Sequence, residues 1–150
     1  MNQLDKLKGI HPGIYLADLL KKRHIRPGQF ALSIGEYPQT LNAIMKGRRA
    51  MNTPLSLKIE KSLNLDEGFL MTLQVFHDIR LEKTKKRQLI KPDLSLFRKG
   101  LFWDTDPEKI DWIAQKKAII NRIMERGNEQ EKNEIELFYK MASQKIATIE

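Results

Sequence analysis

Residues 27–47 are PGQFALSIGEYPQTLNAIMKG, and two short segments of this stretch place apolar side chains at helical spacing on either side of a glycine. The apolar positions are Phe30, Ala31, Ile34, Leu41, Ile44 and Met45. Gly35 can adopt the positive φ that a tight turn requires, and the small Ala31 lets the two backbones approach each other. This spacing is typical of a helix-turn-helix.

The second segment, which we expect to be a helix from Pro38 to Gly47, carries polar side chains suited to DNA. At 100° per residue, Gln39 and Asn42 share a face that points away from the apolar positions. Gln and Asn form bidentate hydrogen bonds with adenine, whereas cations after the helix suit phosphates. An exposed amide is usually only solvated, but its place after a matching turn favours base contact. We predict base contacts from Pro38, Gln39, Thr40, Asn42 and Ala43, and phosphate contacts from Gln29, Lys46, Arg48 and Arg49.

The composition indicates a globular protein. The chain has 150 residues, is 41% hydrophobic and contains no cysteine, which excludes disulfides and thiolate metal sites. No apolar run approaches the roughly 20 residues that span a bilayer, and the first ten residues lack the apolar core of a secretory signal. We therefore expect a cytoplasmic protein without membrane association.

Positive charge is concentrated at the N-terminal end. Residues 1–52 contain nine Lys and Arg against three Asp and Glu, a net +6, whereas residues 93–150 contain ten against eleven, a net −1. The basic end suggests a polyanion partner such as double-stranded DNA, although a basic surface can also serve solubility alone.

Helix signals divide the chain into an all-α domain over 11–82, a basic linker or helix extension over 83–92, and a helical interaction domain over 93–150. We expect no helix before Pro12. Pro12, Pro27 and Pro38 suit the first positions of three helices. Thr53 suits the N-cap of a fourth helix, just before Pro54, and Asp66 is expected to cap a fifth helix. The basic run 83–92 suits a solvated helix end or linker better than a phosphate contact.

The C-terminal part combines aromatic and acidic residues. Phe102, Trp103 and Trp112 suit a core or a protein partner better than base stacking, because their surroundings are acidic. Four carboxylates within eight positions suggest either helix caps or, less readily, a metal site. They are Asp104, Asp106, Glu108 and Asp111. Asp111 is expected to start a helix closed by Gly127, and a last helix after Asn128 is expected to bury Ile135, Phe138 and Met141.

Residues 11 to about 80 resemble the HigA-type antitoxins of the XRE superfamily. The matching motifs are HPGIYL, FALSIG, PQTLNAIMKGRR, TPLSLKIEKSLNL and FLMTLQVFHDI. This resemblance implies a five-helix DNA-binding domain, usually a homodimer, that represses its own promoter and binds a cognate toxin. The later motifs LFWDTDPEKIDW and INRIMERG resemble a small uncharacterised bacterial domain found in proteins neighbouring nucleotidyltransferase-like toxin genes.

The sequence departs from the XRE pattern at the starts of two helices. Pro27 lacks the backbone N–H that would bind a phosphate, Glu36 adds negative charge, and Tyr37 replaces a small hydroxyl cap. An alternative function is therefore a protein-interaction module whose helix-turn-helix no longer binds DNA strongly.

Catalytic patterns are absent from the sequence, and we expect neither an enzyme nor a bound cofactor or metal. There is no glycine-rich phosphate loop, HExxH or GxSxG. The three histidines lie far apart in sequence, and His77 and Asp78 are expected to point about 100° apart on a helix.

Overall fold

The structure is a computed structural model that describes residues 3–150. These residues form helices and short 3-10 turns with no strand. None of the helices in this range combines the length and the apolar character needed to cross a membrane. The elements are α1 (Gln3–Leu7), α2 (Pro12–Lys22), α3 (Pro27–Ser33), α4 (Pro38–Met45), α5 (Thr53–Leu63), α6 (Phe69–Gln88), η1 (Leu94–Leu96), η2 (Lys99–Phe102), η3 (Pro107–Lys109), α7 (Lys116–Arg126) and α8 (Glu129–Ala147).

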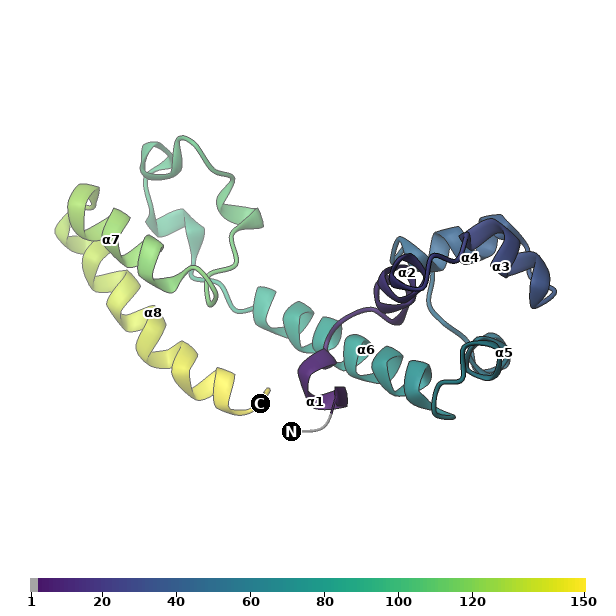
Figure 1. Cartoon of the computed structure of the whole chain (residues 1–150). Helices are drawn as coiled ribbons and strands as arrows, with labels where there is room; N and C mark the ends of the chain where they lie inside the picture. Colours follow the sequence, from purple (N-terminus) through teal and green to yellow (C-terminus); the bar gives the residue numbers. More distant parts are fainter. Residues whose placement is uncertain (1–2) are drawn as a thin grey trace. The chain divides into compact units, whose positions relative to one another are not determined.

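The chain divides into two compact units, the first ending at Leu81 and the second running from Glu82 to Glu150. The division falls inside α6, which is drawn in teal in Figure 1. Each unit has its own hydrophobic core.

In the first unit, α4 packs against both α2 and α3. Gly13 of α2 lies against the end of α4, where a Cβ on this residue would approach the carbonyl oxygen of Ile44 to 1.7 Å. Ala31 is fully buried. Gly13 is therefore a close approach between α2 and α4 that the apolar spacing did not indicate.

The helix starts follow the prolines closely. Pro12, Pro27 and Pro38 occupy the first helical positions of α2, α3 and α4, as expected. The expectation for α5 was wrong by one residue. Asn52, not Thr53, is the N-cap, and its side chain accepts the N–H of Leu55 at 2.9 Å.

Two further expectations for the first unit were wrong. The short helix α1 precedes Pro12, because Gly9 turns the chain at φ 89° only after that helix has ended. Asp66 does not cap α6 through its side chain. Instead the buried Glu60 of α5 accepts the N–H groups of Gly68 at 3.1 Å and of Leu70 at 2.8 Å, which satisfies the start of α6 from another helix.

The second unit is built around aromatic side chains. Trp112 lies at its centre, donates its indole N–H to the carbonyl of Pro107 at 3.2 Å, and accepts the Tyr139 hydroxyl at its own carbonyl at 2.8 Å. The aromatic stretch 93–112 forms 3-10 turns packed on α7 and α8.

Asn128 and Glu131 form a capping box at the start of α8. Gly127 ends α7, as expected, and Asp111 caps a turn that precedes α7, which itself begins at Lys116. Met141 was expected in the core but is exposed, because it lies on the face of α8 opposite Tyr139 and Ile135.

Candidate nucleic-acid interface

The turn between α3 and α4 holds the two helices in a fixed relation. Gly35 adopts φ 71°, and the backbone N–H of Glu36 donates to the carbonyl of Ala31 at 2.9 Å. Any residue with a side chain is disfavoured at that φ, so the turn depends on glycine.

The side chains predicted to contact bases lie on α4. Gln39 and Asn42 are exposed, while Pro38, Thr40 and Ala43 are half-buried. The helix buries Leu41 and Ile44 in the core of the first unit, as the periodicity predicts. An exposed amide pair therefore stands on the outer face of α4, with small side chains beside it.

The side chains predicted to contact phosphates are all exposed. Gln29 lies on α3, and Lys46, Arg48 and Arg49 follow the last turn of α4. Gly47 adopts φ 70°, and the N–H of Arg48 donates to the carbonyl of Ala43 at 2.9 Å, which closes the helix end. The backbone of Arg48 is thus fixed against α4.

These cations form no ion pair within the part of the chain that the structure describes. Across residues 3–150, no carboxylate lies within ion-pair distance of Lys46, Arg48 or Arg49, and the same holds for Lys21 and Arg26. Lys21 and Arg26 were not predicted as site residues, although their place in the basic N-terminal third was visible in the charge count.

The departures from the XRE pattern have local consequences. Arg26 and Tyr37 are the N-caps of α3 and α4, and neither side chain makes a capping hydrogen bond. The carboxylate of Glu36 accepts the N–H of Tyr37 at 3.3 Å. The start of α4 therefore has one weak side-chain acceptor, contributed by an acidic residue.

Two histidines that are distant in sequence lie together in the first unit. The rings of His11 and His77 are 4.9 Å apart, and Nδ1 of His11 accepts the N–H of Gly13 at 3.0 Å. Burial and then the neighbouring His77 lower the pKa of His11. The expectation that His77 and Asp78 point apart was wrong, since Nδ1 of His77 lies 3.6 Å from the Asp78 carboxylate. Adjacent positions differ by 100° around the helix axis, but rotation of the two side chains brings the imidazole and the carboxylate together.

The carboxylates of the second unit are engaged separately. Asp104 forms a bidentate pair with Arg122 at 2.6 and 3.0 Å, which lowers the pKa of Asp104. Asp106 and Asp111 accept backbone N–H groups of their own turns, and Glu108 pairs with Lys91. No group of three or more potential ligands in residues 3–150 is placed to hold a metal ion.

The aromatic side chains predicted to bind a partner are placed differently from one another. Phe102 and Trp112 are 5% and 1% exposed, so they offer no surface to a partner, whereas Trp103 is 72% exposed. Phe102 and Trp112 serve the core instead, because their rings pack on each other at 5.6 Å.

Part of the second unit is similar to a known protein family. Residues 97–148 match the model of a family of unknown function, DUF6922. No curated protein and no solved structure matches the chain.

Proposed function

We propose that the chain is a cytoplasmic, sequence-specific DNA-binding repressor of the HigA-like XRE type, the antitoxin of a toxin–antitoxin pair. The observation that carries the proposal is the exposed amide pair Gln39 and Asn42 on α4, followed by three cations without an ion-pair partner in residues 3–150. Amides at this position suit adenine edges in the major groove, and the cations suit the flanking phosphates.

The proposed protein acts as a homodimer with a five-helix DNA-binding domain. A two-fold pair would place its two recognition helices about 34 Å apart along the DNA, so its operator would be an inverted repeat. The unneutralised positive charge of the first unit would supply the sequence-independent part of the affinity.

Footprinting on the DNA upstream of the protein's own gene tests the proposal. We expect protection of a palindrome, and loss of protection with Gln39→Ala and Asn42→Ala, each of which removes about 1–3 kcal/mol of discrimination. Asn121→Ala removes an exposed amide from α7 and is the matched control. An unprotected upstream region, or equal protection by wild type and both α4 variants, would contradict the proposal.

A second candidate is a protein-interaction module that no longer binds DNA strongly. It is favoured by the absence of side-chain caps on α3 and α4 and by the exposed indole of Trp103. This candidate would be supported over the first by three results together. The chain would capture the product of the adjacent gene, Trp103→Ala would abolish that capture, and the chain would not shift the promoter fragment.

A further inference from the structure

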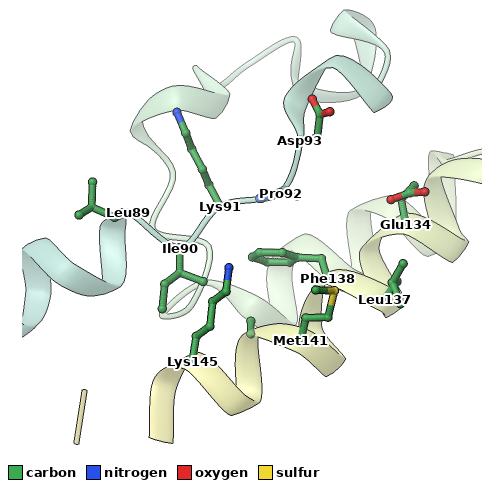
Figure 2. A pocket seen from close by; sticks show the side chains of 11 residues that line it. Leu89, Ile90, Lys91, Pro92, Asp93, Glu134, Leu137, Phe138, Met141 and Lys145 are labelled. Atoms are coloured by element: carbon green, nitrogen blue, oxygen red, sulfur yellow. The ribbon is translucent and has the colours of Figure 1, made fainter. Parts of the chain in front are cut away.

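The second unit has a groove of about 390 Å³ between α8 and the segment that follows α6, lined by both apolar and charged side chains (Figure 2). It exceeds the roughly 150 Å³ that encloses a benzene molecule, so a bulky apolar side chain fits in it. Leu89, Leu137 and Met141 line the groove and are 80%, 53% and 56% exposed. Apolar side chains gathered at one exposed place mark an interaction surface.

One face of α8 forms the floor of this groove. Glu134, Leu137, Met141 and Lys145 follow one another along the helix at intervals of three and four residues, as Figure 2 shows. Phe138 lies beside them and also packs on the core of the unit. This is the spacing of a helix seam that packs on a second helix.

The two ends of the face carry opposite charges. Glu134 and Lys145 are eleven residues apart, which places them on the same side of the helix about 16 Å from each other. Within residues 3–150 neither has an ion-pair partner, whereas Lys91, also at the groove, pairs with Glu108. The face is therefore acidic at its N-terminal end, apolar in the middle and basic at its C-terminal end.

Two copies of this face are complementary when the two helices run in opposite directions, because the acidic end of each then meets the basic end of the other. A two-fold axis crossing α8 between Tyr139 and Lys140 would set Glu134 of one copy against Lys145 of the other, twice. The same axis would set Phe138 opposite Met141 in the centre. A basic membrane-binding face or an acyl-chain site would leave Glu134 without a counter-charge.

We propose that this face of α8 is the surface through which two copies of the chain pair, antiparallel, with each Met141 in the groove of the other copy. The inference names the pairing surface of the dimeric repressor, and it rests on that proposed function for its biological role. Its test measures association without DNA.

Sedimentation velocity on the full chain at about 50 mM salt provides the first test, because charge effects are only partly screened there. We expect a species of about twice the 17.5 kDa mass of one chain. Met141→Glu should raise the dimer dissociation constant at least about tenfold, by placing a charge in the apolar centre. A monomeric wild type, or an undiminished Met141→Glu dimer, would overturn the proposal.

Charge reversal provides the second test, which identifies the partner and its direction. Glu134→Lys alone and Lys145→Glu alone should each weaken self-association about tenfold or more. The double variant, and an equimolar mixture of the two single variants, should both regain the dimer. Recovery in the mixture also shows that the variants fold. Glu125→Lys, the same change on α7, should leave the dimer unchanged.

The outcomes separate the pairing surface from the proposed function. Single variants that remain dimeric, or a mixture that stays monomeric, would overturn antiparallel pairing through α8 whatever the DNA result. If self-association changes with the charge reversals as expected but the chain binds no upstream DNA, the repressor function would be overturned and the pairing surface would remain supported.

Discussion

Gly13 determines how closely α2 approaches α4. Besides the carbonyl of Ile44, a Cβ at this position would meet the backbone nitrogen of Met45 at 2.9 Å. Both neighbours are backbone atoms, which cannot move aside as a flexible side chain can. The position of the outer face of α4 therefore depends on the absence of one methyl group.

Replacing this glycine tests the dependence directly. Gly13→Ala should destabilise the first unit by about 3 kcal/mol or more, because it forces two packed backbones apart. Gly28→Ala is the control, since a Cβ there meets nothing within 4 Å and helix propensity favours alanine by up to about 1 kcal/mol. Thermal unfolding followed by circular dichroism gives the comparison, and equal melting temperatures for the two variants would contradict it.

Glu131 holds the start of α8 and the segment before η2 together. Its buried carboxylate accepts the backbone N–H, Nε and Nη2 of Arg98 at 2.9–3.0 Å, and the backbone N–H of Asn128 at 2.8 Å. The hydrogen bonds from Arg98 contribute most to lowering the pKa of Glu131 from 4.5 to about 2.

The second unit should therefore lose stability in acid. The unfolded chain binds a proton at Glu131 near pH 4.5 and the folded chain only near pH 2, so this contribution is complete above 4.5 and is lost as the pH falls toward 2. Both tryptophans lie in this unit, so tryptophan fluorescence during urea unfolding reports on it.

The glutamine variant tests the role of the charge. Glu131→Gln should cost about 2 kcal/mol at pH 7 and flatten the dependence between pH 4.5 and 2. Glu125→Gln should neither lower stability at pH 7 nor change its dependence on pH. An unchanged pH profile in Glu131→Gln would assign the acid sensitivity to other groups.

At the scale of helices, the sequence predicted the helix starts that proline determines. The starts at Pro12, Pro27 and Pro38 agree because a fixed φ and a missing N–H restrict proline to few helical positions. The cap of α6 was predicted wrongly because the residue that provides it, Glu60, belongs to the preceding helix. The exposed face of α4 was predictable from periodicity. The close contact of Gly13 with the end of α4 was not, because it depends on how two helices pack.

The cap that Glu60 provides for α6 gives a prediction at this scale. Glu60→Ala would leave the half-buried N–H of Gly68 and the buried N–H of Leu70 without acceptors, and it should destabilise the first unit by about 2 kcal/mol. Glu67→Ala, at an exposed position just before α6, should change stability by less than about 0.5 kcal/mol. Comparable losses in the two variants, measured by thermal unfolding, would rule out the cap.

At the scale of the whole molecule, charge separates along the chain. The three cations that follow α4 have no ion-pair partner in residues 3–150, whereas Arg98 and Arg122 of the second unit are each bound by a carboxylate. The sequence predicted the excess of charge but not which cations are paired, because pairing depends on contacts such as Arg122 with Asp104, eighteen residues apart.

If the chain binds DNA as proposed, the dependence of its DNA affinity on salt should depend on the three cations that follow α4. Lys46→Ala, Arg48→Ala and Arg49→Ala should each lower the slope of log affinity against log salt by about 1, and weaken binding to all sequences alike. Lys99→Ala, an exposed lysine of the second unit, should leave the slope unchanged. Equal slopes for all four variants would exclude phosphate contacts after α4.

The most direct test of the DNA-binding account is the ratio of two affinities measured at one salt concentration. Fluorescence anisotropy would compare the DNA upstream of the protein's own gene with a scrambled duplex of the same composition. We predict that wild type prefers its own DNA by at least about 1,000-fold. Asn42→Ala should reduce that preference about tenfold while leaving the affinity for scrambled DNA unchanged. Equal affinity of wild type for the two duplexes would contradict the account.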